Sequence, residues 1–353
     1  MSDIRVLSAT IDEIKPHPNA DRLDLAVIGG YTTVVVRGEF NPGDIVAFFP
    51  PDILIPESIA IQFGVAKYLK TAVYPGETKK TNCRVSAARL RGVPSFGFVF
   101  KLRGVEAGVD LTERYHAVKY EPPEPLWFSL TGDTKASGPK FHVYTDIENY
   151  RNSRFKGAFE TGLPVRITEK IHGTNSRVAI LGGEFHCGSH NTNKKEYPKN
   201  SDKHSVYWSP LTEEMKALLR SFDQDVIVFG EIYGSKIQNM DYGIYGYTGY
   251  KVFDISVDGQ YLNWCDVESV CKQFNIPTVP LLYLGPFYPE IVDQLVDGPT
   301  TIVEPALIKS AYKGREGIVI TPLYEQHSDI MGGRLIAKAV SCDYLSARKS
   351  DSH

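Results

Sequence analysis

Lysines, carboxylates and an aromatic residue recur in short strand-like segments along the C-terminal two-thirds of the chain. Five segments follow one another in this order: Glu169-Lys170-Ile171-His172-Gly173-Thr174-Asn175, Phe229-Gly230-Glu231, Phe253-Asp254-Ile255, Glu316-Gly317-Ile318-Val319 and Ala337-Lys338-Ala339-Val340. A lysine that bonds covalently to a nucleotide phosphate needs a metal held by carboxylates, a ring that stacks on the base and a cation for the phosphates. The set, more than any single segment, predicts a nucleotide-transfer site.

Lys170 is the candidate nucleophile. It ends a strand-like run that begins at Pro164, and Gly173 follows three residues later, where a phosphate could come close to the backbone. A lysine attacks phosphorus only as the neutral amine, and its ordinary pKa is about 10.4, so burial or a nearby positive charge must favour the neutral form. Lys101 has the same spacing to a following glycine, but no carboxylate segments follow it at suitable distances. We interpret Lys101 as a chance match.

Glu231 and Glu316 are the candidate metal ligands. Each stands at the edge of an apolar run, from which a carboxylate can point out of a sheet into a cleft. Magnesium and manganese prefer such oxygen ligands, and a divalent ion there would neutralise phosphate charge. Viewed singly, each glutamate could equally be a surface residue.

Phe253, Arg334 and Lys338 are candidates for holding the nucleotide. The Phe253 ring could stack on a purine, although a phenylalanine in an apolar strand is more often part of the core. Arg334 and Lys338 would share one face of a strand with Ile336 and suit the charge of a triphosphate.

Composition indicates a globular protein that stays inside the cell. The 353 residues are 42% hydrophobic, contain no apolar run of about 18 residues and begin without the pattern of a secretion signal. We expect no membrane contact and a location in the cytoplasm, with the nucleus or a virus-infected cell as alternatives. No obligatory protein partner is evident. The cysteines lack Cys-x-x-Cys spacing, so we expect them to be reduced and mostly buried: Cys83, Cys187, Cys265, Cys271 and Cys342.

Charge is distributed unevenly along the N-terminal part. Residues 1–66 hold 4 Lys or Arg against 9 Asp or Glu, whereas residues 67–103 hold 9 against 1, although the whole chain has a net charge of −3. The second range predicts a basic surface for phosphates, and an ordinary solvated face is the alternative. The candidate RNA-binding residues there are Lys79, Lys80, Arg84, Arg89 and Arg91.

The fold predicted is α+β in two domains. Residues 1–120 read as short strands between glycine and proline turns, which favours a small β-barrel; 121–140 read as a proline-rich linker; 141–353 mix strands and helices in antiparallel sheets with flanking helices. Hairpins are expected at 178–187 and 252–263. Helices are expected after Ser209 as N-cap and at 266–274.

These segments resemble, in order, motifs I, III, IIIa, IV and V of the covalent nucleotidyltransferase superfamily, which contains polynucleotide ligases and RNA capping enzymes. The segment around Lys170 is similar to that of the phage RNA ligase 2 group. The stretch from Ile14 to Asp24 resembles the opening of OB-fold tRNA-binding domains. The order of OB domain, linker and ligase domain is similar to Naegleria-type RNA ligases, whereas DNA ligases and capping enzymes carry an OB domain after motif V.

The resemblance implies roles for further residues. Lys170 would become lysyl-AMP, with help from His172, and Asn175 would act at the nucleotide and near the RNA ends. Glu169 and an arginine before motif I, best matched by Arg151, would contact the nucleotide. His190 stands where many relatives have an arginine, and Ile336 where many have a lysine, so those phosphate contacts differ here.

The sequence therefore predicts an RNA-repair ligase that uses ATP and a divalent metal, magnesium or manganese. It would join a 3′-hydroxyl to a 5′-phosphate through lysyl-AMP and RNA-adenylate. The alternatives are a DNA-sealing or GTP-using capping-type nucleotidyltransferase, and a catalytically weak RNA-binding homologue.

Overall fold

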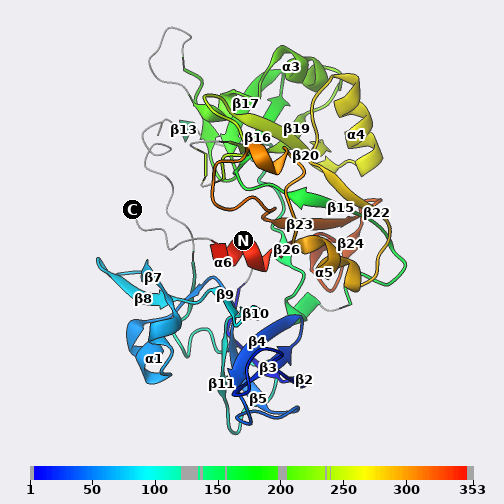
Figure 1. Ribbon diagram of the computed structural model, residues 1–353. Coiled ribbons are helices and arrows are strands. Elements are labelled where there is room, and N and C mark those ends of the chain that lie inside the picture. The colour runs from blue at the N-terminus through cyan, green and yellow to red at the C-terminus, as the bar shows by residue number, and fades with distance from the viewer. Residues whose placement is uncertain are drawn as a thin grey trace. The chain divides into compact units, whose positions relative to one another are not determined.

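The computed structural model describes residues 4–120, 134–135, 138–155, 157–197, 205–234, 237–238 and 240–347. The chain forms two compact units (Figure 1). The N-terminal unit comprises Met1–Pro122, Glu148–Gly157 and Val340–His353, and the C-terminal unit comprises Pro123–Ile147 and Ala158–Ala339. The predicted boundaries differ from these, because 148–157 and the chain end cluster with the N-terminal unit. Most of the predicted linker, 121–140, lies outside the described residues.

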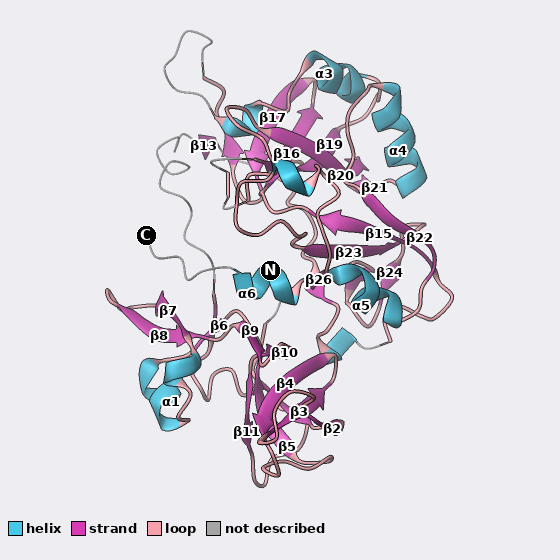
Figure 2. Ribbon diagram, in the orientation of Figure 1, coloured by secondary structure: helices cyan, strands magenta, loops and turns pink. Residues whose placement is uncertain are grey.

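The N-terminal unit is built mainly from short strands (Figure 2). Its strands are β1 (Leu7–Thr10), β2 (Glu13–Pro16), β3 (Leu23–Ile28), β4 (Tyr31–Val36), β5 (Ile45–Phe49), β6 (Ile53–Leu54), β7 (Lys70–Val73), β8 (Lys80–Arg84), β9 (Ala87–Leu90), β10 (Val93–Phe96), β11 (Phe98–Lys101), β12 (Val118–Lys119) and β14 (Glu148–Asn149). Its helices are α1 (Glu57–Gln62) and α6 (Cys342–Ala347), with 3₁₀ turns at Ala66–Tyr68 and Ser153–Phe155.

Residues of β3 and β4 alternate between buried and partly exposed, so one face of their sheet packs on the core of this unit. Every second residue of both strands is buried, as expected for a sheet with one face on the core. The strand orders are β1-β5-β11, β2-β3-β4, β10-β9 and β12-β6-β8-β7. The short strands that the sequence predicts for the N-terminal domain are therefore confirmed.

Helix α6 completes this core from the far end of the sequence. Cys342 is buried in the same apolar cluster as residues of β3, β4 and β5, and Leu345 packs against that cluster. The Lys70 amine donates a hydrogen bond to the Leu345 carbonyl at 3.2 Å, and Arg89 pairs with Asp343. From the sequence this segment is expected in the ligase domain. Local sequence patterns carry no information about contacts between residues so far apart in the chain.

The C-terminal unit contains two larger antiparallel sheets with helices against them. Its strands are β13 (Thr134–Lys135), β15 (Pro164–Lys170), β16 (Thr174–Leu181), β17 (Glu184–Ser189), β18 (Asn193–Lys194), β19 (Val226–Tyr233), β20 (Gly249–Val257), β21 (Gln260–Tyr261), β22 (Leu281–Pro286), β23 (Gly317–Pro322), β24 (His327–Ser328), β25 (Gly333–Arg334) and β26 (Ala337–Val340). Its helices are α3 (Glu213–Arg220), α4 (Trp264–Gln273) and α5 (Glu290–Val296), with 3₁₀ turns at Val206–Trp208 and Pro305–Leu307.

The strand order places the motif-bearing strands at the centre of each sheet. One sheet runs β13-β18-β17-β16-β19-β20-β21, and the other contains β26, β23, β15 and β22 in that order. Helices α3 and α4 pack on the first sheet and α5 on the second. Central strands have neighbours on both sides, so side chains at their ends are held firmly.

Both predicted hairpins of this unit are confirmed. Strands β16 and β17 pair around Gly182 and Gly183, and β20 and β21 pair around Asp258 and Gly259. All four turn residues have positive φ between 48° and 84°, as a two-residue hairpin turn requires. The Asp225 carboxylate accepts a hydrogen bond from the Gly182 backbone at 2.7 Å and fixes the first turn.

The helix predicted to begin after Ser209 begins later. Its N-cap is Thr212, whose hydroxyl accepts from the Met215 amide at 3.3 Å, whereas the Ser209 hydroxyl donates to the Val206 carbonyl. Ser209 instead ends the preceding 3₁₀ turn, Val206–Trp208. A serine before a proline is also the usual pattern of a helix N-cap, so the sequence pattern does not distinguish the two roles. The second predicted helix is confirmed as α4, two residues longer at its start.

The predicted state of the cysteines is also confirmed. All five are free thiols; four are buried and Cys265 is exposed. Among the described residues, no helix is long and apolar enough to cross a membrane.

Candidate nucleotidyltransferase site

Lys170 and Glu316 meet because β15 and β23 are neighbours in one sheet. Lys170, the last residue of β15, is paired with Gly317, the first residue of β23, so Glu316 stands directly beside the lysine. The Lys170 amine lies 2.8 Å from Glu316 Oε1, and the two side chains are 26% and 12% exposed. The sequence expectation of a lysine at a strand end, close to a carboxylate, agrees with this geometry.

His172 joins the same group. Its Nδ1 lies 3.6 Å from Glu316 Oε2, a distance of ion pairing rather than of a hydrogen bond. The His172 backbone amide donates to the Tyr242 hydroxyl at 2.7 Å, and Tyr242 is fully buried. The turn after Lys170 is therefore held by a tyrosine that the sequence analysis did not identify.

The two glutamates carry opposite pKa shifts. Burial acts to raise the pKa of Glu316, but the positive charge of Lys170 and the interaction with His172 outweigh it and bring that pKa to about 2. Burial raises the pKa of Glu231 to about 8, opposed by Lys170 and assisted by repulsion from Glu316. Near neutral pH Glu316 is therefore ionised, whereas Glu231 is mostly protonated. Binding of a metal cation beside Glu231 would favour its ionised form.

This arrangement suits a divalent cation. Glu316 Oε2 is buried and accepts no hydrogen bond from the described residues, and a cation would relieve the repulsion between the two carboxylates. Within the described ranges there is no group of three or more His, Cys, Asp or Glu side chains that could hold a metal alone. Two carboxylates beside substrate phosphates are a set that magnesium or manganese accepts.

A cavity of about 240 Å³ opens beside Lys170, between the two sheets. Its apolar lining includes Phe253, Val319 and Ile336, and its polar lining includes Lys170 and Glu231. Phe253 lines this cavity and also packs against an apolar core cluster, so its stacking on a base stays a prediction. Further residues of the lining are Tyr144, Ile147, Arg166, Thr168, Glu169, Ile171, Asn175 and Val279.

Two polar side chains of this cavity hold unused hydrogen-bonding atoms. Asn175 Oδ1 and Arg166 Nε and Nη1 are buried without a partner among the described residues. Arg166 is 5% exposed, and its guanidinium lies 3.9 Å from the centre of the Trp264 ring. Buried polar groups are normally satisfied, so these atoms mark places for polar atoms of a ligand. Arg166 was missed, although its alternation with Thr168 and Lys170 along one strand could have identified it.

Asn175 and Glu231 lie opposite each other in the pairing of β16 with β19. Glu169, by contrast, has its carboxylate occupied inside the protein. Its oxygens accept hydrogen bonds from the Thr300 hydroxyl at 2.5 Å and from the backbone and hydroxyl of Thr301 at 2.7 Å. A contact of Glu169 with a nucleotide stays a prediction.

Gly173 is needed for a reason that differs from the expected approach of a phosphate. A Cβ at this position would lie 2.2 Å from the Ile232 carbonyl oxygen and 3.0 Å from Glu231 Cγ. The glycine therefore allows β19 to come close to the turn after Lys170. The contact therefore holds Glu231 close to the turn that follows Lys170.

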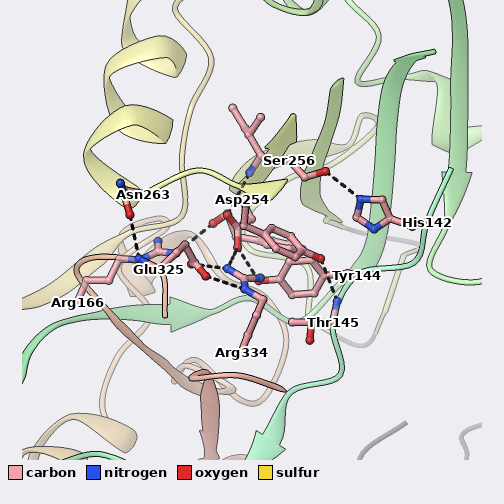
Figure 3. Close-up of polar contacts among 12 residues, drawn as sticks. His142, Tyr144, Thr145, Arg166, Asp254, Ser256, Asn263, Glu325 and Arg334 are labelled. Carbon is pink, nitrogen blue, oxygen red and sulfur yellow. Dashed lines mark hydrogen bonds and ion pairs between the residues drawn. The ribbon is translucent and has the colours of Figure 1, made fainter. Parts of the chain in front are cut away.

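The expected position of Arg334 is wrong. Arg334 ends β25, which pairs with β24, and does not share a strand with Lys338 in β26. Figure 3 shows its guanidinium between carboxylates: Nη2 donates to Asp254 at 2.8 Å and Nε donates to Glu325 at 2.9 Å. The Tyr144 hydroxyl also donates to Asp254, at 2.9 Å. Arg334 anchors the strand beside Phe253 through Nε and Nη2, but its buried Nη1 has no partner among the described residues, so its contact with the triphosphate stays a prediction.

Three other predicted nucleotide contacts stay predictions. Lys338 lies in β26, two residues after Ile336, which lines the cavity. His190 follows the end of β17. Arg151 belongs to the N-terminal unit, where its Nη1 donates to the Gly30 carbonyl at 3.4 Å and its guanidinium lies 5.2 Å from the Phe96 ring centre.

The predicted RNA-binding residues of the N-terminal unit have three different surroundings. Arg84 is buried, pairs with Asp52 at 2.8 Å and covers the ring of Tyr120, so it belongs to the interior and is a wrong assignment. Arg89 pairs with Asp343 of α6. Lys79, Lys80 and Arg91 are exposed and remain candidates for phosphate contacts.

Two domain comparisons agree with this fold and site. An OB-fold domain matches residues 6–102, and the RNA ligase family matches residues 163–340, half of the chain. The fold is that of a ligase domain preceded by an OB fold, as predicted. The chain belongs to the RNA ligase family.

Solved structures of the Naegleria gruberi RNA ligase are similar over almost the whole chain. A mutant without ligand is 25% identical, with a TM-score of 0.76 and coverage of 98% of both chains. The same ligase with PPi is 25% identical, with a TM-score of 0.75 over 97% of this chain and 98% of that one. A mutant with ATP and Mn is 24% identical, with a TM-score of 0.77 and the same coverage. Comparison with curated protein sequences gives no match.

Proposed function

We propose that this protein is an ATP-dependent RNA ligase that joins RNA 3′-hydroxyl and 5′-phosphate ends. The observation that carries the proposal is the pairing of Lys170 with Glu316 at the cavity that holds Phe253. Membership of the RNA ligase family and the ATP, Mn and PPi named for the Naegleria gruberi structures support it.

In the first step the Lys170 amine, after losing a proton to solvent, attacks the α-phosphorus of ATP. A nitrogen–phosphorus bond forms, the bond to the bridging oxygen breaks, and pyrophosphate leaves. Glu316 orients the amine at 2.8 Å and, with His172, keeps it at the mouth of the cavity. The purine stacks on Phe253, and its polar atoms meet Asn175 and Arg166.

The carboxylates of Glu231 and Glu316 would hold the divalent ion. When bound, magnesium or manganese would neutralise phosphate charge and disfavour positive charge on the nearby amine. Lys338 is the first candidate cation for the triphosphate, and Arg334 is the second, because two of its three guanidinium nitrogens already donate to carboxylates.

The second and third steps use the same site. The AMP moves from Lys170 to the 5′-phosphate of RNA, and a 3′-hydroxyl then displaces AMP and seals the strand. Asn175 would contact the RNA end. Exposed Lys79, Lys80 and Arg91 of the N-terminal unit would bind phosphates of the flanking RNA.

A labelling experiment tests the first step. Wild-type protein with labelled ATP and manganese should acquire acid-labile AMP, and Lys170→Ala should acquire none. Lys101→Ala is the matched control, because Lys101 has the same spacing to a glycine but pairs with Asp44 in the N-terminal unit. Labelling by GTP instead of ATP would favour a capping-type enzyme.

A sealing assay tests the substrate. Strands of 5′-phosphate RNA, nicked and unpaired, should be joined at least tenfold faster than matched DNA strands. Preferential joining of DNA would contradict the proposal, and absence of any labelling by nucleotide would favour a binding protein.

A further inference from the structure

Two loops of the C-terminal unit present aromatic and basic side chains to solvent. Tyr245 is 42% exposed, Tyr247 68% and Leu307 60%. The exposed Lys309 places its amine 4.1 Å from the centre of the Tyr245 ring. We call Tyr245, Tyr247, Leu307 and Lys309 the Tyr245 surface.

Hydrogen bonds and burial hold this surface in place. The Asp241 carboxylate accepts from the backbone amides of Gly243 and Ser310, each at 2.8 Å, and thereby ties one loop to the other. The Tyr245 hydroxyl donates to the same carboxylate at 3.2 Å. Alternate residues of the first loop point inward and are buried: Met240, Tyr242 and Ile244. The exposed rings therefore stand on an ordered base, so little conformational entropy would be lost on binding.

The loops are attached to the catalytic residues. Tyr242, three residues before Tyr245, accepts the hydrogen bond from the His172 backbone amide at 2.7 Å. The second loop leads directly to Glu316, which pairs with Lys170. The Tyr245 surface therefore belongs to the same two loops that lead to the catalytic residues.

An exposed tyrosine ring with a lysine at its face suits a nucleobase and the phosphate next to it. Bases of any sequence stack on aromatic rings, and cations beside the ring bind the backbone. RNA that is recognised in single strands is usually bound with its bases unstacked from one another. A protein partner would be expected to meet a more apolar surface without a lysine at its centre.

We propose that the Tyr245 surface binds an unpaired nucleotide of the RNA next to the sealed end, with the base on Tyr245 or Tyr247 and a phosphate at Lys309. This inference rests on the proposed RNA ligase function. It assigns the surface to RNA and not to ATP, since the proposed function places the ATP in the cavity lined by Phe253.

Two variants remove the two kinds of contact. The double variant Tyr245→Ala, Tyr247→Ala should weaken binding of single-stranded 5′-phosphate RNA about tenfold, measured by fluorescence anisotropy. Lys309→Gln should lower affinity at low salt and reduce its dependence on salt by about one phosphate contact. Sealing of unpaired RNA ends should slow in proportion, while lysyl-AMP formation from ATP should keep its wild-type rate.

Controls separate stacking from folding. Tyr245→Phe keeps the ring and loses only the hydroxyl, so it should bind RNA like the wild type. Tyr324→Ala removes a tyrosine that is 61% exposed elsewhere in the C-terminal unit and should leave RNA binding unchanged. Unchanged RNA affinity in the double variant and in Lys309→Gln would overturn the inference. Slower lysyl-AMP formation in the double variant, with normal thermal unfolding, would also overturn it by assigning the surface to ATP.

The labelling assay distinguishes failure of this inference from failure of the proposed function. If wild-type protein forms lysyl-AMP but the variants bind RNA normally, only the Tyr245 surface is rejected. If wild-type protein forms no lysyl-AMP, the ligase function itself is rejected.

Discussion

Glu231 and Glu316 are identical side chains whose surroundings give them different protonation states. Glu316 lies against Lys170 and stays ionised, with a pKa of about 2. Glu231 is also partly buried, but desolvation dominates there and raises its pKa to about 8. The difference arises from position, since the Lys170 ammonium lies 2.8 Å from a Glu316 oxygen, whereas its attraction does not offset the desolvation of Glu231.

The Glu231 pKa predicts a pH-dependent stability of the metal-free protein. The folded pKa of about 8 exceeds the ordinary value of 4.5, so the unfolded state loses its proton first as pH rises. Stability should therefore fall between about pH 4.5 and 8, by roughly 2 kcal/mol after allowance for partial exposure. Thermal unfolding with a chelator, from pH 5 to pH 8, measures this loss, and Glu231→Gln should reduce it.

Metal binding should oppose this loss of stability at higher pH, because the metal binds the ionised form of Glu231. Manganese needs ionised Glu231, so its binding near pH 7 should release about one proton. Calorimetry in two buffers of different ionisation enthalpy measures that proton. Equal heats in both buffers, or identical pH profiles for the wild type and Glu231→Gln, would contradict this account.

At the scale of elements, the close approach of β19 to the turn after β15 determines where Glu231 lies in the site. Strand β19 reaches the turn after β15 only because Gly173 has no side chain. The same approach positions Glu231 opposite Asn175. The geometry of the site therefore depends on a backbone contact as much as on its charged residues.

Gly173→Ala should disrupt this approach. The new Cβ would meet the Ile232 carbonyl at 2.2 Å, so β19 must move, with a loss of about 1–3 kcal/mol in stability and of at least tenfold in the rate of lysyl-AMP formation. Gly333→Ala, where a Cβ meets no heavy atom within 4 Å, is the matched control. Equal adenylylation rates in both variants would show that the contact is not needed.

The start of α3 offers a second test at this scale. Thr212→Ala removes the hydrogen bond to the Met215 amide and should cost about 1 kcal/mol of stability. Ser209→Ala should cost less, because that hydroxyl does not cap the helix. Chemical unfolding of the two variants compares the costs, and the reverse order would restore the cap predicted from sequence.

At the scale of the whole molecule, the end of the chain stabilises the unit at its beginning. Helix α6 contributes Cys342 and Leu345 to the N-terminal core, and Asp343 pairs with Arg89. The OB-fold unit is therefore incomplete without residues that follow the last ligase motif.

Deleting residues 341–353 should destabilise the N-terminal unit by about 2–4 kcal/mol, since it removes buried side chains from that core. The measurement is the rate of tryptic cleavage within residues 4–120, read by mass spectrometry. Deleting only 348–353 is the control. Equal cleavage of the full-length protein and the longer deletion would contradict the assignment of α6 to this core.

The sequence by itself determined the motif order, the hairpins and the class of chemistry. These follow from local patterns: alternating apolar residues, glycine at turns and a lysine at a strand end, all encoded within a few neighbouring positions. The tertiary structure decided which groups meet. Arg334 and Arg84 are paired with carboxylates, and Gly173 allows β19 to approach the turn after Lys170. Arg166 lines the cavity, and α6 packs in the N-terminal core. Those outcomes depend on strand register and burial between segments far apart in the chain, and short patterns carry no information about such distances.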